Sequence, residues 1–273
     1  MKNKKILIFG KGFIGTRLHE ELKCDITAAM INSYENAEKE IKKYNPGIVI
    51  NCIGYTGVSN VDDCEKDIDQ TLTANVFVPL ILAEACLRSN AKFVHISSGC
   101  IYDFDYSRPE PLTEDDEPLY FKLFYSRSKI YSEKALLSLS KKLDVLILRI
   151  RIPLDDRKHP KNVLAKLIRY KTVIDVPNSI TYIPDFIEAM KHLLKIDARG
   201  LFNVVNKGAL GYPELLNVYK KYDGNFEYTV IPLERLNLER TNLILSTEKL
   251  EKTGFKVRKI QDVLEECVKG FIS

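Results

Sequence analysis

The sequence is poor in the patterns that hold metal ions. It contains only four histidines, and its six cysteines form no Cys-x-x-Cys pair and no spacing with histidine that is typical of a zinc site. We therefore expect no bound metal. In a reducing compartment the cysteines should all be free thiols, namely Cys24, Cys52, Cys64, Cys86, Cys100 and Cys267.

Long apolar runs and an excess of charge are also missing. The first apolar run, KILIFG, follows basic residues but is too short for a signal sequence or a membrane span, and no other segment reaches spanning length. The net charge of +4 is spread along the chain, with basic and acidic residues alternating. These absences predict a cytoplasmic protein with no nucleic-acid or membrane partner. They leave the oligomeric state open, a homodimer included.

Apolar stretches of strand length alternate with segments of helical spacing over the first ~150 residues. Such alternation is the signature of α/β proteins in which helices cover a parallel sheet. We predict a doubly wound parallel sheet of the Rossmann type. Its strands are expected at 4–10, 26–31, 47–54, 92–98 and 144–150, and its helices at 13–22, 35–44, 69–88 and 123–143.

The rest of the chain has a mixed pattern, and no linker rich in Pro, Gly and Ser separates it from the first part. We expect a smaller C-terminal lobe joined to the sheet domain. Residues 1–152 are assigned to the sheet domain, to which 175–205 return, and residues 153–174 and 206–273 to a lobe that binds substrate. The expected elements are helices at 184–195, 212–222 and 260–271 and a strand at 200–206.

A glycine-rich loop joins the first strand to the first helix as GxGxxG. The first glycine of this motif allows a tight turn, the second lets the backbone approach a pyrophosphate, and the third lets the helix pack on the strand. The phosphates then meet the N-terminus of the helix. The loop predicts that the sheet domain binds a dinucleotide through Gly10, Lys11, Gly12, Phe13, Ile14 and Gly15.

The second strand lacks the acidic residue that commonly binds the ribose 2′-hydroxyl of NAD. The chain reads Ile31-Asn32-Ser33 at that place, and Lys11 and Arg17 lie close enough in sequence to supply positive charge. We therefore predict NADPH as the cofactor, with NADH possible but weaker.

Tyr125 and Lys129 form a YxxxK motif in the expected helix 123–143. Residues four apart share one face of a helix, and a lysine there can lower the pKa of a tyrosine through its charge. Ser98 ends the fourth strand. A hydroxyl, a phenol and an ammonium group, placed in this order of elements, suit the transfer of a hydride to a carbonyl.

Motifs spread over nearly the whole chain resemble one family. They are GKGFIG, NCIGYTGVSNVDDCE, LTANV, SSGCIY, FYSRSK, LRIRIP, HPKNVLAKLIRY, DVPNSIT and STEKL. The chain is similar to the extended short-chain dehydrogenase/reductases, in particular to the dTDP-4-dehydrorhamnose reductase branch. Within that branch it is most like the bifunctional 3,5-epimerase/4-reductases that make nucleotide-linked L-rhamnose. In one departure, its glycine loop is a residue shorter than the usual GxxGxxG.

The resemblance gives a role to Cys100, two residues past Ser98. It implies that Cys100 removes protons from the sugar during epimerisation and that Lys166 reprotonates from the opposite face. An ordinary thiol, with a pKa near ~8.5, needs only a modest shift to act as a base at neutral pH. Two structural alternatives stay open: Cys100 as a small packed side chain, and Lys166 as an exposed helix lysine.

The resemblance also implies the remaining contacts. The expected cofactor contacts beyond the glycine loop are Asn32, Cys52, Ile53, Gly54, Asn75, Tyr125 and Lys129, with Asn75 ordering a water or the active-site backbone. The expected substrate contacts are Asn60, Asp62, Ser98, Asn162 and Asn178.

Three functions follow as hypotheses. The first is conversion of UDP-4-keto-6-deoxy-D-glucose to UDP-L-rhamnose by C3/C5 epimerisation and NADPH-dependent C4 reduction. The second is a 4-reductase without epimerase activity, for which Cys100 would be unnecessary, and UDP and dTDP substrates are both compatible with the sequence. The third is a regulatory subunit that binds NADP without catalysis, and it predicts a damaged YxxxK motif or serine, whereas both are intact here.

Overall fold

The computed structural model describes residues 4–58, 60–108, 110–236 and 241–273. The chain forms two compact units. The first comprises Met1–Ile101, Pro118–Arg149 and Leu193–Phe202, and the second comprises Tyr102–Glu117, Ile150–His192 and Asn203–Ser273. The later stretch that returns to the first unit is therefore shorter than the expected 175–205. The division of cofactor and substrate binding between the two parts of the chain stays a prediction.

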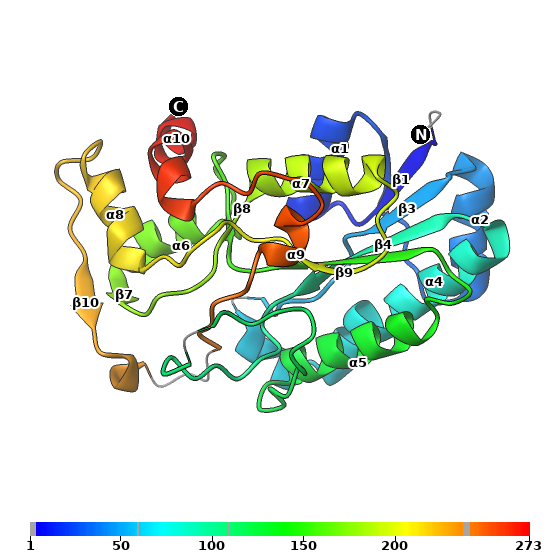
Figure 1. The fold of residues 1–273 in the computed structure, drawn as a ribbon, viewed down its shortest axis with the longest axis horizontal. Helices are drawn as coiled ribbons and strands as arrows, with labels where there is room; N and C mark the ends of the chain where they lie inside the picture. The colour runs from blue at the N-terminus through cyan, green and yellow to red at the C-terminus, as the bar shows by residue number, and fades with distance from the viewer. Residues whose placement is uncertain (1–3, 59, 109, 237–240) are drawn as a thin grey trace. The chain divides into compact units, whose positions relative to one another are not determined.

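A six-stranded sheet is the centre of the first unit (Figure 1), with the order β2-β1-β3-β4-β5-β9. β1 pairs in parallel with β2 and β3, and β3 pairs in parallel with β4. The strand order reverses at β1: β2 lies on one side of it, and β3, β4, β5 and β9 follow on the other side. This arrangement confirms the doubly wound Rossmann-type fold. The strands are β1 (Ile6–Phe9), β2 (Asp25–Thr27), β3 (Ile48–Asn51), β4 (Lys92–Ser98), β5 (Val145–Ile150) and β9 (Gly200–Asn203).

Helices cover both faces of this sheet. α1 (Phe13–Leu22) lies on one face, and α4 (Val78–Ser89) and α5 (Phe124–Ser138) lie on the other (Figure 1). α2 (Tyr34–Tyr44) joins α4 and α5 in a single apolar core with the strands. Branched and aromatic side chains of β1, β3, β4 and β5 fill that core, as expected for strands buried on both faces.

The expected helix 69–88 consists of three pieces: α3 (Ile68–Leu72), a π-helical turn η2 (Thr73–Phe77), and α4. Within the described residues, the stretch Ile68–Ser89 is long and apolar enough to cross a membrane, so the expectation that no segment reaches spanning length is wrong by that measure. Half of its most apolar window is buried. Val78 and Leu82 pack in the sheet core, which accounts for the high hydropathy.

The second unit has two short parallel strand pairs: β6 (Pro153–Leu154) with β8 (Thr181–Tyr182), and β7 (Thr172–Ile174) with β10 (Thr229–Ile231). α6 (Val163–Tyr170), α8 (Tyr212–Lys220) and α10 (Ile260–Ile272) share an apolar core with β6, β7 and β8, and Figure 1 shows the three helices gathered together. The remaining elements of this part of the chain are α7 (Ile183–Lys195), α9 (Glu248–Glu251) and the short 3-10 helix η3 (Leu233–Arg235). A further 3-10 helix, η1 (Val61–Glu65), belongs to the first unit.

Candidate active site

The glycine loop lies at the carboxyl end of β1, where the strand order reverses. Gly10 has φ +105°, and a Cβ on it would lie 2.9 Å from the backbone nitrogen of Ile53. A Cβ on Gly15 would lie 1.9 Å from the carbonyl oxygen of Gly10, so both positions require glycine. α1 begins at Gly12 with no side-chain cap and no acid in its first turn. This arrangement suits the pyrophosphate of a dinucleotide, because the N-terminus of a helix attracts anions.

The ribose end of the expected cofactor site differs from the prediction in detail. β2 ends at Thr27, so Asn32 lies five residues beyond the strand instead of at its end. Asn32 and Lys11 are exposed, Phe13 is buried and Ile14 is partly buried. Arg17 is buried and its guanidinium bonds Glu21 at 2.9 Å, which leaves the exposed Lys11 as the better placed of the two cations considered.

The loop after β3 is held by two asparagine side chains. The Oδ1 atom of Asn51 accepts a hydrogen bond from Ile53 N at 3.0 Å. Asn75, in the π-helical turn, accepts from Tyr55 N at 2.8 Å and donates to Tyr55 O at 2.9 Å. Asn75 thus holds the backbone of this loop, which also carries Cys52 and Gly54, and its expected role at the active site stays a prediction. π-helical turns inside helices occur frequently at functional sites.

Gly54 marks a close approach between the β3 loop and the helix that carries the YxxxK motif. A Cβ on Gly54 would lie 3.4 Å from both Asn75 Oδ1 and Lys129 Nζ. The structure thus brings together three residues that the sequence analysis placed at the cofactor: Gly54, Asn75 and Lys129.

The turn after β4 is tied to α5. The hydroxyl of Ser98 accepts a hydrogen bond from Cys100 N at 3.1 Å. The hydroxyl of Ser126 donates to Cys100 O at 2.5 Å. Ser98 is buried and Cys100 is half-buried. Because Ser126 directly follows Tyr125, these bonds hold the serine and cysteine turn against the start of the helix that carries the tyrosine.

Tyr125 and Lys129 are both buried on α5. Burial lowers the pKa of Lys129 to about 8, and the carboxylate of Glu133, together with Cys64 and Cys100 in their thiolate forms, opposes that shift. Lys129 is therefore an ammonium group close to the point of losing its proton. The two residues of the expected motif therefore lie on one buried face of α5. At such a place the charge of Lys129 is little screened by solvent.

Sequence reasoning missed a residue that fixes the start of this helix. α5 has no capping side chain of its own at Leu123. The carboxylate of Glu65, from η1, accepts a hydrogen bond from Phe124 N at 2.5 Å and pairs with Arg127. Glu65 ends the NVDDCE motif, so the motif was noticed but this contact, across 59 positions of sequence, was not.

Asn60 and Asp62 belong to the same short element. Asn60 begins η1 and its side chain accepts a hydrogen bond from Asp62 N at 2.9 Å, while Asp63 bonds back to Asn60 N. Gly57, with φ +73°, lets this turn close, since a Cβ there would lie 1.8 Å from Asn60 O. Both expected substrate residues are partly buried, and their contact with substrate stays a prediction.

Three expected site residues lie in the second unit. Lys166 is half-buried on α6, and its proton-donor role stays a prediction. Asn162 begins α6 and makes four hydrogen bonds, to Asp155 and to neighbouring backbone. Asn178 also makes four, with Arg151 among its partners. Both asparagines are buried and their amides are used within the protein, so the structure gives no support to substrate contact through them.

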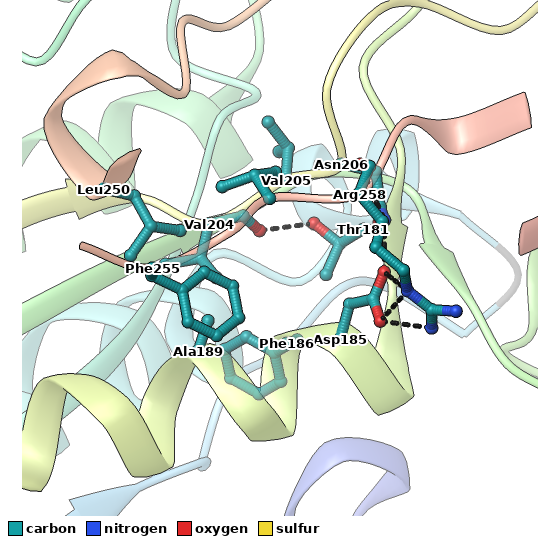
Figure 2. A pocket seen from close by; sticks show the side chains of 11 residues that line it. Thr181, Asp185, Phe186, Ala189, Val204, Val205, Asn206, Leu250, Phe255 and Arg258 are labelled. Carbon is teal, nitrogen blue, oxygen red and sulfur yellow. Dashed lines mark hydrogen bonds and ion pairs between the residues drawn. The ribbon is translucent and has the colours of Figure 1, made fainter. Parts of the chain in front are cut away.

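The second unit also contains a small cavity between α7, the 204–206 stretch and the segment around Phe255 (Figure 2). Its volume is about 10 Å³, room for about one water molecule. Phe186 and Phe255 contribute much of its lining, and Asp185 and Arg258 lie at one end. A cavity of this size holds no sugar or nucleotide, so it is a packing feature of the unit.

Comparison with known proteins shows the family to which the chain belongs. The family model for the RmlD substrate binding domain matches residues 4–208. The chain is 30% identical to the bifunctional dTDP-4-dehydrorhamnose 3,5-epimerase/dTDP-4-dehydrorhamnose reductase of Arabidopsis thaliana, over 96% of this chain and 91% of that protein. It is also 30% identical to the trifunctional UDP-glucose 4,6-dehydratase/UDP-4-keto-6-deoxy-D-glucose 3,5-epimerase/UDP-4-keto-L-rhamnose-reductase RHM2 of the same plant, over 97% of this chain, but spans only 42% of that protein.

Among solved structures, the L780 UDP-rhamnose synthase from Acanthamoeba polyphaga mimivirus is similar along its whole length. The TM-score is 0.90 and the identity is 27%, with 98% of this chain and 100% of that chain covered. The family resemblance drawn from the motifs is thus confirmed. The chain belongs to the RmlD substrate binding domain family.

Proposed function

We propose that this chain converts UDP-4-keto-6-deoxy-D-glucose to UDP-L-rhamnose, by epimerisation at C3 and C5 followed by NADPH-dependent reduction at C4. The observation that carries the proposal is the link between the Ser98–Cys100 turn and α5. The Ser126 hydroxyl bonds Cys100 O one residue from Tyr125, and this bond ties the turn that carries Ser98 and Cys100 to the start of the helix that carries Tyr125.

The reduction needs a proton donor beside the carbonyl oxygen. The glycine loop, Asn75 and Lys129 would hold NADPH, whose chemistry when bound would be to supply a hydride to C4 of the sugar. Tyr125 gives its phenolic proton to the oxygen as the carbonyl becomes an alcohol, and Ser98 donates a hydrogen bond to the same oxygen. Lys129, a buried ammonium, stabilises the phenolate that Tyr125 becomes.

The epimerisation uses the same oxygen contacts. Removal of a proton next to the ketone forms an enolate, which Ser98 and Tyr125 stabilise by hydrogen bonds. Cys100, as thiolate, takes the proton from C3, and Lys166, as ammonium, returns a proton on the opposite face. Cys100 then gives its proton to solvent and Lys166 takes one up, so that the same pair can invert C5. The name of the Arabidopsis bifunctional relative, an epimerase and reductase of dTDP-4-dehydrorhamnose, supports this pair of steps. The name of L780, a UDP-rhamnose synthase, supports the UDP form of the substrate.

Two features of the first unit support a dinucleotide in general, and two more support NADPH. The glycine loop accepts only glycine at Gly10 and Gly15, α1 begins without a competing side chain, and Lys11 is exposed next to that loop. No carboxylate lies in the sequence between Thr27 and Tyr34, directly after β2. A higher kcat/KM with NADH than with NADPH would contradict this part of the proposal.

The direct test is to incubate the purified protein with UDP-4-keto-6-deoxy-D-glucose and NADPH in D₂O. We expect UDP-L-rhamnose that carries deuterium at C3 and C5, identified by mass spectrometry and NMR. Reduction to a D-configured sugar without deuterium at those positions would leave a 4-reductase without epimerase activity. Absence of any NADPH oxidation with either a UDP or a dTDP substrate would contradict the reductase itself.

A further inference from the structure

Buried polar side chains join β4, α5 and β5 in the first unit. His95 and Ser97 lie two apart on β4 and share one face of the strand. Ser97 donates to Glu133 of α5 at 2.5 Å, and Arg149 of β5 bonds the same carboxylate through Nε and Nη2 at 2.6–3.1 Å. Glu133 and Arg149 are almost completely buried.

Arg149 and Glu133 form a buried ion pair. An arginine does not lose its proton in proteins, and removal of one partner of a buried pair leaves an uncompensated charge. Each oxygen of the Glu133 carboxylate accepts hydrogen bonds from Arg149, and Ser97 adds another. A fixed negative charge therefore lies inside the fold at this position.

Lys129 lies one helical turn before Glu133 on the same face of α5. The groups that face Lys129 from other elements are Cys64 of η1, Cys100 after β4, and His95 of β4. From η2 comes only the neutral amide of Asn75, which with Lys129 Nζ faces Gly54. Glu133, on the same helix as Lys129, is the one carboxylate among the groups named here as facing the lysine.

His95 adds no positive charge beside Lys129. Its Nδ1 atom lies 3.1 Å from Asn51 Nδ2, and because Asn51 Oδ1 already accepts from Ile53 N, the amide nitrogen is the donor. Burial, and next the charge of Lys129, hold the pKa of His95 well below its ordinary value. Neutral His95 leaves Glu133 as the main charge that sets the state of the lysine.

We propose that Glu133 is a positioning residue of the active site: fixed by Arg149 and Ser97, its carboxylate keeps Lys129 in the ammonium form on the helix that carries Tyr125. The inference deepens the proposed reductase function and rests on it for its meaning in catalysis. The protonation of Lys129, however, is a property of the protein alone and can be measured without substrate.

The test is a pH titration of the Lys129 ammonium nitrogen by NMR of ¹⁵N-lysine-labelled protein, with the signal assigned through Lys129→Arg. In Glu133→Gln we expect the midpoint to fall by about one pH unit, since loss of a nearby opposite charge shifts a pKa by that amount or more. Glu133→Asp keeps the charge and should restore most of the shift. Glu84→Gln, an exposed acid of α4 that pairs with Arg88, is the matched control and should leave the midpoint unchanged.

Activity gives the second reading. The alkaline limb of the kcat/KM profile for reduction should move to lower pH in Glu133→Gln by the same amount as the NMR midpoint. If Glu133→Gln fails to fold, the double variant Glu133→Gln/Arg149→Met removes both charges, a replacement that buried pairs often tolerate. The Glu133 charge acts on the pKa of Lys129 from one helical turn away, so the double variant should shift in the same direction, by less than Glu133→Gln because a positive charge is removed with it.

An unchanged Lys129 midpoint in a folded Glu133→Gln or double variant would overturn the inference. A shifted midpoint in a protein that reduces no nucleotide-4-keto sugar would instead uphold the link between Glu133 and Lys129 and contradict the proposed function. The two failures are therefore distinguishable.

Discussion

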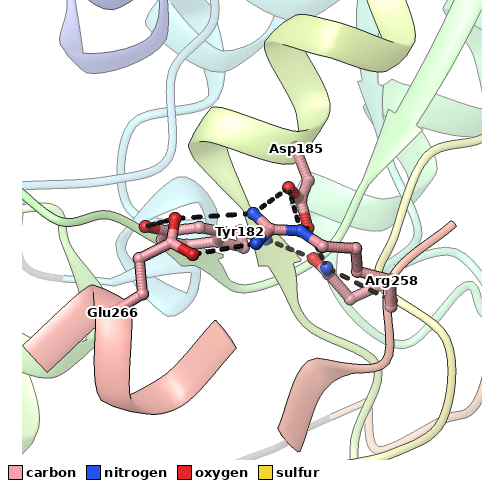
Figure 3. A network of polar contacts seen from close by, with 5 residues as sticks. Tyr182, Asp185, Arg258 and Glu266 are labelled. Carbon is pink, nitrogen blue, oxygen red and sulfur yellow. Dashed lines mark hydrogen bonds and ion pairs between the residues drawn. The ribbon is translucent and has the colours of Figure 1, made fainter. Parts of the chain in front are cut away.

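Each unit of the molecule contains an arginine bound to carboxylates, and the two pairs differ in their surroundings. In the first unit Arg149 and Glu133 are each 2% exposed in their side chains. In the second unit Arg258 bonds Asp185 at 2.5 Å and Glu266 at 2.8 Å (Figure 3), and its side chain is 38% exposed. The bonds are alike in geometry, so the difference lies in what the carboxylates do besides holding the arginine.

The network of the second unit joins parts of the backbone. Asp185, at the start of α7, also accepts from Asn206 at 2.5 Å, and Asn206 accepts from Tyr182 N at 2.8 Å. Glu266 of α10 accepts from the Tyr182 hydroxyl at 3.1 Å. The hydrogen bonds of Asp185 and Glu266 therefore connect α7 and α10 to the segments that carry Arg258 and Asn206. In the first unit the carboxylate of Glu133 lies one turn from a buried lysine, so the same chemistry there controls a titratable group.

The largest expected effect belongs to Tyr125. Tyr125→Phe removes the proton donor and should slow reduction about 10²–10⁴-fold, the usual contribution of a positioned acid, with little change in NADPH affinity. Single-turnover oxidation of NADPH and fluorescence titration of the cofactor measure the two effects. Tyr131→Phe changes an exposed tyrosine of the same helix and is the control. Reduction by Tyr125→Phe at close to the wild-type rate would contradict the reductase assignment.

Cys100→Ser separates the two steps of the proposed reaction. A hydroxyl ionises far less readily than a thiol, so deuterium incorporation at C3 and C5 should be lost, while a 4-keto sugar already in the L-configuration should still be reduced. Cys24→Ser, at a half-buried cysteine after α1, should leave both steps unchanged. If Cys100→Ser still makes UDP-L-rhamnose at the normal rate, Cys100 is a packing residue.

Lys129→Met should change how stability depends on pH. The pKa of Lys129 is about 8 in the folded protein against 10.5 ordinarily, so between these values the unfolded chain binds more protons and wild-type stability rises with pH. The wild type should gain about 3 kcal/mol relative to Lys129→Met across that window. Denaturant unfolding of both proteins at several pH values measures the difference, in which other lysines and tyrosines cancel. If the stability of the two proteins changed with pH in parallel, the pKa of Lys129 in the folded protein would not be lowered.

The sequence predicted the fold of the first unit because buried parallel strands are continuous apolar runs. Boundaries were less certain: the strand expected at 26–31 is Asp25–Thr27, and residues Ala28 to Ile31 continue as coil. The helix expected at 69–88 contains a π-helical turn at Asn75 that no periodicity reveals. Such features depend on contacts with distant residues, here Tyr55 and Ser128.

The site was predictable where a motif encodes it locally, as at Gly10, Gly15, Tyr125 and Lys129. Residues that act across the sequence were not found. Glu133 has a visible signal, four positions after Lys129, and Arg149 is a charge inside the apolar run DVLILRI, which calls for a buried partner. Pairing the two would have required the strand order. Asn162, taken as a substrate contact by resemblance, is used in capping α6.

The smallest expected effect tests the second network. Arg258→Met removes hydrogen bonds to Asp185 and Glu266, and because hydrogen bonds to charged groups contribute about 1.5–3 kcal/mol each when buried, we expect a loss of about 2 kcal/mol in these partly exposed surroundings. Denaturant unfolding measures that loss, with Lys252→Met, in an exposed pair with Glu248, as a control that should cost little. The Lys129 midpoint should not move, in contrast to Glu133→Gln. A shifted midpoint in a folded Arg258→Met variant would show that the two arginine pairs do not have separate roles, because only a change at the first pair is expected to reach the lysine.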